Sequence, residues 1–129
     1  MTAPSEGGVG GRLSEILSSL RSIQGVRGAA IARQDGLVVF HSLPPGFDPD
    51  KLAAIAAAVF GTGEMSSREM DQGLFQRCMM EAEEGKIIYV GAGPDAIIAT
   101  VVEREANLGL ILLALEKATE EVKEVLRGI

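Results

Sequence analysis

The chain has 129 residues, of which 47% are hydrophobic and 23% are charged, and its formal net charge is −6 at pH 7. This length and composition predict one globular domain with a hydrophobic core of its own, and they exclude a disordered chain. The 12 Lys and Arg residues are scattered along an acidic sequence, which argues against nucleic acid and against an anionic membrane as partners.

The N-terminal segment, residues 1–11, is rich in Gly, Pro and Ser and is predicted to be a flexible tail before a domain of residues 12–129. It lacks the basic start and apolar centre of a signal peptide, and no apolar run reaches membrane-spanning length. A single cysteine, Cys78, cannot build an internal disulfide framework and favours a reducing compartment. We therefore expect a cytoplasmic protein.

The first predicted element is an amphipathic helix over residues 12–24, because apolar residues recur there at intervals of three and four. These residues are Leu13, Ile16, Leu17, Leu20 and Ile23. Two β-prone runs follow, at residues 26–33 and 37–42, on either side of Asp35 and Gly36. An Asp-Gly pair between such runs predicts a hairpin, since Gly accepts the positive φ that a tight turn requires.

The second helix is predicted to begin after Asp48, a capping residue, with Pro49 in its first position, and to end near Met70. One stripe is ordinary core material: Leu52, Ile55, Val59 and Phe60. The other faces carry small residues and no charge between positions 52 and 63: Ala53, Ala54, Ala57, Ala58 and Gly61. Either a partner covers this face, because small side chains let another backbone approach, or the small residues simply favour helix. The missing charges favour a partner.

Three more strands are predicted at residues 73–83, 86–92 and 96–103, separated by Gly-containing turn signals. A last helix begins near Asn107. Its first two turns have no polar face, so we expect them to be buried on all sides. The apolar residues there are Leu108, Leu110, Ile111, Leu112, Leu113 and Leu115. The order α-β-β-α-β-β-β-α with tight hairpins predicts an α/β sandwich with one five-stranded, mostly antiparallel sheet.

Few residues offer chemistry. His41 is the only histidine and has no recognisable partner, and Cys78 is interpreted as a small buried residue of the third strand. The GAGPD run at residues 91–95 leads into a strand, so it is interpreted as a turn and not as a phosphate loop. The acidic cluster at residues 81–84 lacks the alternating ligands of a calcium loop. We predict no catalytic residue, no cofactor and no metal.

Three segments together resemble the roadblock, or dynein light-chain, domain family, which includes MglB-type regulators of Ras-like GTPases. They are the IARQDGLVV hairpin, the DPDKLAAIAAAVFGTGE helix and the ANLGLILLALEKATEEV helix. The resemblance covers about residues 12–127. It implies a roadblock fold, a profilin-like sandwich with strand order 2-1-5-4-3, with the first and third helices on one face and the second on the other. It also implies that the chain is not an enzyme.

The resemblance further implies a homodimer, or a heterodimer with a second roadblock chain, that binds a Ras-like small GTPase as a noncatalytic regulator or scaffold, with or without stimulating GTP hydrolysis. A structural light-chain-like subunit of a larger assembly and a small-molecule sensor remain alternatives. The expected dimer interface joins the second helices and the third strands: Ala53, Ala54, Ala57, Ala58, Gly61, Phe75, Arg77, Cys78 and Met79.

A rim of charges at the ends of the second helix is the candidate surface that faces the GTPase: Asp50, Lys51, Glu64 and Arg68. Arg68 and Arg77 lie in regions where an arginine finger is conceivable, although the family implies that the residues of the GTPase itself are repositioned instead. Cys78 is a candidate for a position near the two-fold axis of the dimer, since the third strand would pair with its own copy.

Overall fold

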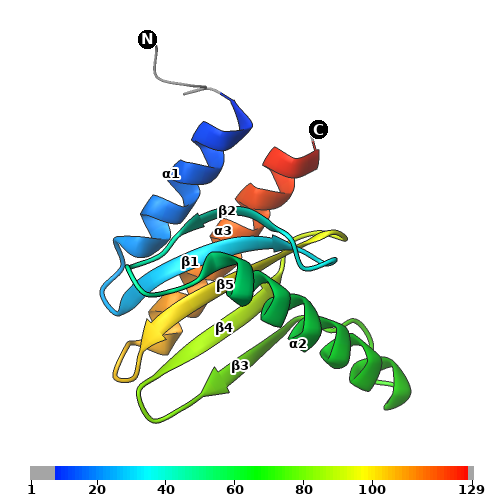
Figure 1. The fold of residues 1–129 in the computed structure, drawn as a ribbon. Coiled ribbons are helices and arrows are strands. Elements are labelled where there is room, and N and C mark those ends of the chain that lie inside the picture. The colour runs from blue at the N-terminus through cyan, green and yellow to red at the C-terminus, as the bar shows by residue number, and fades with distance from the viewer. Residues whose placement is uncertain (1–7, 128–129) are drawn as a thin grey trace.

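Three helices and five strands follow one another in the predicted order in the computed structural model, which describes residues 8–127 (Figure 1). The helices are α1 (Val9–Arg21), α2 (Pro49–Glu69) and α3 (Leu108–Arg127). The strands are β1 (Val26–Arg33), β2 (Val38–Ser42), β3 (Arg77–Glu81), β4 (Gly85–Gly91) and β5 (Ala96–Glu103). No helix in this described part of the chain is long and apolar enough to cross a membrane.

The five strands form one sheet in the order β2-β1-β5-β4-β3, and every neighbouring pair is antiparallel. The hairpins close at the predicted turns, where Gly36 and Gly93 have positive φ of 94° and 84°. In the first turn, the backbone N–H of Arg33 donates to the carbonyl oxygen of Leu37 over 2.8 Å. The order and pairing of the strands therefore confirm the fold predicted from the sequence.

The sheet has a separate core on each face, because successive side chains of a strand point to opposite sides. Along β5, Ile98 and Val102 point into the core beneath α1 and α3, whereas Ile97 and Val101 point into the core beneath α2. Figure 1 shows α1 and α3 behind the sheet and α2 crossing its other face. This placement of the helices is also the predicted one.

The first helix begins earlier than predicted, so the assignment of residues 9–11 to a flexible tail is wrong. Val9 packs against the core, and the N–H of Arg12 donates to the carbonyl oxygen of Gly8 over 3.0 Å. This packing outweighs the low helix propensity of Gly10 and Gly11. Residues 1–7 of the predicted tail lie outside the described residues.

Strand β3 is shorter than predicted, because its first four expected residues belong to the loop that follows α2. Phe75 turns back onto α2 and stacks edge to face on Phe60, with ring centroids 4.8 Å apart and planes at 73°. A Cβ at Gly63 would overlap the Phe75 ring, so glycine makes this close approach possible. Phe75 is therefore partly buried against the core beneath α2 and does not lie on the edge strand as predicted.

A candidate protein-binding surface on α2 and β3

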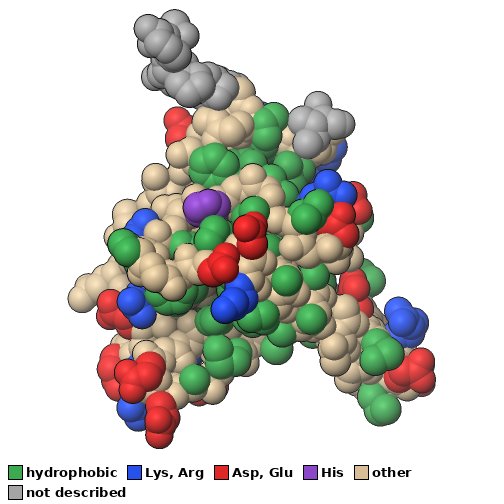
Figure 2. Space-filling model, in the orientation of Figure 1, with side chains coloured by type: hydrophobic (Ala, Val, Ile, Leu, Met, Phe, Trp, Pro, Cys, Tyr) green, Lys and Arg blue, Asp and Glu red, His purple; other side chains and the backbone are tan. Residues whose placement is uncertain are grey.

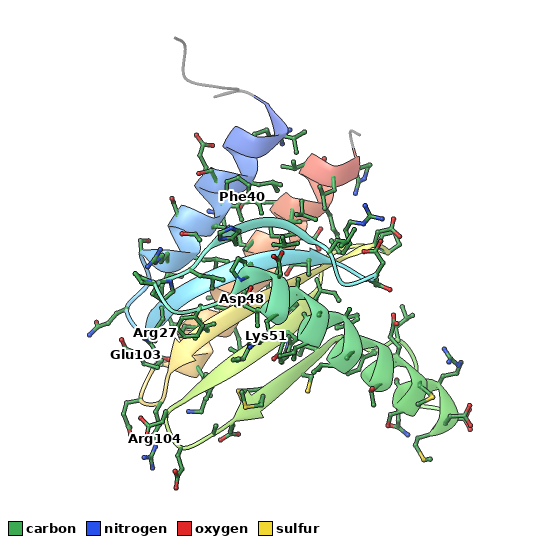
Figure 3. The ribbon with its side chains drawn as sticks, viewed as in Figure 1. Arg27, Phe40, Asp48, Lys51, Glu103 and Arg104 are labelled. Atoms are coloured by element: carbon green, nitrogen blue, oxygen red, sulfur yellow. The ribbon has the colours of Figure 1, made fainter. Side chains whose placement is uncertain are left out.

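The outward face of α2 carries a row of exposed residues spaced four, three and four apart. Its start is fixed locally, because the Asp48 carboxylate accepts hydrogen bonds from the N–H groups of Asp50 and Lys51 over 3.0 and 3.3 Å (Figure 3). Pro49 occupies the first turn, as predicted. The row consists of Ala54, Ala58, Gly61 and Met65.

Two residues of α2 lie on the opposite side from the predicted one. Ala53 is fully buried against the sheet with Ala56, so its assignment to a dimer interface is wrong. Ile55, expected in the core, is 45% exposed beside the row. Under the helix, the sheet presents three alanines beside the larger Tyr89, Ile97 and Val101, and the alanines leave room for the helix to come close. The three alanines are Ala30, Ala32 and Ala99.

The remaining predicted residues of α2 separate into two groups. Ala54, Ala58 and Gly61 are exposed, Ala57 is partly buried, and open space surrounds the Cα of Gly61. Met65, at 52% exposure, completes the row although the sequence reasoning missed it. Its spacing from Gly61 was the signal that would have identified it.

Strand β3 lies at one edge of the sheet and pairs, within the described residues, with β4 alone. Its five pairs with β4 run from Arg77 opposite Val90 to Glu81 opposite Lys86 without a break. The other edge strand, β2, is paired irregularly, with a register shift between Ile31 and Ala32 of β1. A regular exposed edge is open to pairing with another strand, and bulges of this kind discourage it.

The side chains of β3 alternate between the two faces of the sheet. Cys78 and Met80 lie opposite Tyr89 and Ile87 of the α2 core, so they point to the same side as α2. The predicted interface residues Arg77 and Met79 point to the other side and are exposed. We call the α2 row, Ile55, Cys78 and Met80 together the α2–β3 surface. Met80 was also missed, although the alternation along the strand pairs it with Cys78.

Charged residues lie at both ends of the α2–β3 surface and are missing along its length, as Figure 2 shows for this face of the molecule. Asp50 and Lys51 are exposed at the start of α2, and Arg68 is exposed in its last turn. Glu64, the fourth residue of the predicted rim, turns instead toward a groove beside Phe60 and Phe75. The structure therefore brings three of the four rim residues to the ends of one apolar row.

That groove has a volume of about 740 Å³ and runs between α3 and the edge formed by β3 and β4. Its apolar lining includes Phe60, Phe75, Val90 and Leu112, and its charged lining has both signs: Arg77, Lys123, Glu64, Glu116 and Glu120. It is open to solvent and is not enclosed between a helix and the sheet. It therefore lacks the enclosed shape expected of a small-molecule sensor.

The other residues considered for chemistry are placed apart from one another. His41 is exposed on β2, and Cys78 is a half-buried free thiol on β3. Within residues 8–127, no three His, Cys, Asp or Glu side chains are grouped as a metal would require. Burial raises the pKa of the Tyr89 phenol above 10.0, and the neighbouring Cys78 adds to this rise.

Comparison with known proteins gives consistent matches. The model of the Roadblock/LC7 domain family matches residues 12–102. The uncharacterised protein MJ1340 of Methanocaldococcus jannaschii is 32% identical over 111 residues, which are 86% of this chain and 96% of that protein. The gliding protein MglB of Thermus thermophilus superimposes with a TM-score of 0.85 at 21% identity, over 99% of this chain and all of that chain. Profilin II of Acanthamoeba castellanii has a TM-score of 0.59 at 19% identity, over 91% and 96% of the two chains.

Proposed function

The chain belongs to the Roadblock/LC7 domain family, and we propose that it is a noncatalytic regulator or scaffold, which forms a dimer and binds a Ras-like small GTPase. The observation that carries the proposal is the α2–β3 surface, an uncharged helix row beside a regular, unpaired sheet edge. A monomer would leave both features in water, where exposed apolar area and free strand edges favour association.

In the proposed dimer the two β3 strands pair antiparallel and the two α2 helices cross side by side. The α2 row is self-complementary in an antiparallel arrangement. When Ala58 faces Gly61 of the second copy, Ala54 faces the second copy's Met65, so the one large side chain of the row lies against a small one. Alternation of large and small residues across a contact is how well-packed interfaces fill space. This complementarity favours a homodimer over a pair of different roadblock chains.

The two α2 helices of such a dimer form a shallow apolar platform with charges at its ends. Asp50, Lys51 and Arg68 are exposed there and supply a polar rim. An apolar centre with a polar rim is the usual anatomy of a protein–protein contact. We assign this platform to the GTPase on the basis of the family resemblance, and we assign no catalytic residue to the chain itself.

The proposal is tested by measuring binding to Ras-like GTPases of the source organism in their GDP and GTP states. We expect preferential binding to one nucleotide state, and we expect Ala58→Glu to abolish it because the charge prevents the two α2 helices from pairing to form the platform. Ser18→Glu, an exposed position of α1, is the matched control and should bind normally. If no Ras-like GTPase binds in either state, the proposed GTPase regulator is contradicted and the alternative of a structural subunit is favoured.

The noncatalytic part of the proposal needs a separate measurement of GTP hydrolysis. If the GTPase residues are only repositioned, Arg68→Ala and Arg77→Ala should each leave most of any stimulation intact. Loss of an arginine finger costs about a thousandfold or more in rate. A loss of that size in either variant, at unchanged binding, would contradict the noncatalytic assignment.

The formation of a disulfide by Cys78 tests where the two-fold axis of the proposed dimer crosses β3. A disulfide requires Cα atoms within about 7 Å, so only a cysteine next to the axis can link to its copy. If the axis passes at Cys78, mild oxidation gives a covalent dimer on a non-reducing gel, and Cys78→Ser gives none. If the unmodified protein gives no covalent dimer, the two-fold axis does not pass at Cys78 and must lie nearer to another residue of β3.

A further inference from the structure

The sulfur-containing side chains are gathered in one part of the molecule. Four of the five methionines lie in the described residues, and all four fall within residues 65–80, together with the only cysteine. Met65 and Met70 lie at the end of α2, and Met79 and Met80 lie on β3, where Figure 3 shows sulfur atoms in yellow. All four side chains are exposed. An exposed thioether is open to attack on a peroxide, so this region is the candidate for oxidation.

The other large apolar side chains that the described residues expose are leucines and one isoleucine, which contain no sulfur. At the start of α3, Leu110 is 51% exposed and Leu113 is 65% exposed, against the prediction that this end of the helix is buried on all sides. The sheet and α1 cover α3 on two sides only, which leaves these leucines in water. Hydrocarbon side chains do not react with peroxide, so the chemistry below is confined to the methionines.

The four methionines form two matched pairs. Met65 ends the exposed α2 row, whereas Met70 follows five residues later, on a different side of the helix. Met80 points to the α2 side of β3, whereas Met79 points to the opposite side, at nearly the same exposure of 38% against 39%. Each pair therefore has one thioether on the α2–β3 surface and one outside it.

We propose that Met65 and Met80 are modification sites, at which oxidation by a peroxide separates the proposed dimer; this inference rests on that dimer. In the antiparallel α2 contact, Met65 faces Ala54 of the second copy. A sulfoxide there places a polar oxygen against a methyl group, and the neighbouring backbone N–H groups are already bonded within the helix. Met80 points to the face of the sheet on which α2 of the second copy lies in the dimer. Oxidation therefore disfavours the associated state.

The reaction is a two-electron oxidation that needs no other group of the protein. The thioether sulfur attacks one oxygen of hydrogen peroxide, the O–O bond breaks, and the second oxygen leaves as water with both protons. The sulfur is oxidised to the sulfoxide, and the peroxide is reduced. A methionine sulfoxide reductase reverses the change with two thiols, which form a disulfide while the sulfoxide oxygen leaves as water. The modification is therefore reversible.

The test follows peroxide oxidation of the full chain with Cys78→Ser in every protein, so that thiol oxidation does not contribute. Peptide mass spectrometry measures the sulfoxide at each methionine, and sedimentation velocity measures the association state. Complete oxidation of this parent protein should raise the dissociation constant of the dimer about tenfold or more, because polar groups are left unpaired in the contact. Reductases for both sulfoxide epimers, supplied with a thiol, should restore the dimer.

Two double variants separate the methionines on the surface from those outside it. Met65→Leu with Met80→Leu removes the two surface sulfur atoms at little change of volume, so its dimer should survive the peroxide. Met70→Leu with Met79→Leu is the matched control and should dissociate like the parent protein. In the monomeric Ala58→Glu variant, Met65 and Met80 should be oxidised severalfold faster than in the dimer, whereas Met70 and Met79 should react at unchanged rates.

The outcomes distinguish this inference from the proposed dimer. A dimer that persists when Met65 and Met80 are fully oxidised, or equal dissociation of the two double variants, would overturn the inference and leave the dimer standing. A monomer before any peroxide is added would overturn both. Far-ultraviolet circular dichroism separates dissociation from unfolding, since the oxidised chain should keep the spectrum of the Ala58→Glu monomer. Loss of that spectrum would assign the effect to unfolding and would also overturn the inference.

Discussion

Helices α2 and α3 lie on opposite faces of one sheet, and each leaves an apolar surface toward solvent by different means. On α2 the surface is long and made of small residues, with Ala54, Ala58 and Gly61 in one row. On α3 it is short and made of two large leucines, followed by charges. A long flat row suits a helix packed along its length, whereas a short raised patch suits a local and weaker contact.

The difference between the two helices begins in the sheet beneath them. The face under α2 presents Ala30, Ala32 and Ala99 beside Tyr89, Ile97 and Val101, and α2 covers it with the small Ala53 and Ala56 between the larger Leu52 and Phe60. The face under α1 and α3 presents Ile88, Ile98 and Val102, so α3 inserts large side chains between α1 and the sheet. The volume available under a helix therefore decides which of its residues face inward.

The largest expected effect is the loss of the proposed dimer in Ala58→Glu. An unpaired charge buried in a contact costs about 3–5 kcal/mol, which weakens association by roughly a hundredfold or more. Size-exclusion chromatography with light scattering should give a dimer for the unmodified protein and a monomer for the variant. A monomer for the unmodified protein at high micromolar concentration would contradict the assignment of α2 as the dimer surface.

Two neighbouring leucines of α3 should respond very differently to truncation. Leu115 is 1% exposed in the core, so Leu115→Ala should lower the free energy of unfolding by about 2–5 kcal/mol. Leu113→Ala should change it by less than about 0.5 kcal/mol, because the side chain is mostly in water. Urea unfolding at micromolar concentration measures both. Equal losses in the two variants would mean that Leu113 is buried in solution.

Two glycines of α2 should respond with opposite signs to the same substitution. Gly63→Ala forces a Cβ into the Phe75 ring, and overpacking of this kind costs about 1–3 kcal/mol. Gly61→Ala meets open space and should gain up to about 1 kcal/mol from helix propensity. Unfolding of both variants is measured in the monomeric Ala58→Glu background, so that contacts between subunits do not contribute. Stabilisation by Gly63→Ala would show that Phe75 does not pack there.

The smallest expected effect concerns the only tyrosine, Tyr89, which lies under α2 beside Cys78. Burial first, and Cys78 second, raise its pKa above the ordinary 10.0. The folded state therefore favours the neutral phenol, so this contribution to stability is complete below pH 10 and is lost as the pH rises through the folded pKa.

Absorbance of the phenolate measures this titration directly, since the chain has no tryptophan. A dimer that covers β3 should raise the pKa further in the unmodified protein than in Ala58→Glu. Cys78→Ser should keep most of the rise, because burial is its main cause. A pKa at or below 10.0 in the folded protein would contradict the burial of Tyr89.

Local signals in the sequence were sufficient for the ends of most elements. Asp48 and Pro49 determine the start of α2 through hydrogen bonds and a backbone angle that involve only near neighbours. Gly36 and Gly93 determine two hairpin turns in the same way. The predicted start of the third strand at residue 73 was wrong because Phe75 packs on Phe60 of α2, a contact that no local pattern indicates.

The sequence by itself determined the order of the elements and the antiparallel hairpins, because these depend on turn residues and on the period of apolar positions. The family followed from the resemblance of three segments to known members. Only the tertiary structure decided that Ala53 is buried while Ile55 is exposed, and that Leu110 and Leu113 point to solvent. Helical periodicity gives the spacing of a face but not its direction when apolar residues surround the helix. The direction is set by the volumes of the side chains on the sheet, which come from distant parts of the chain.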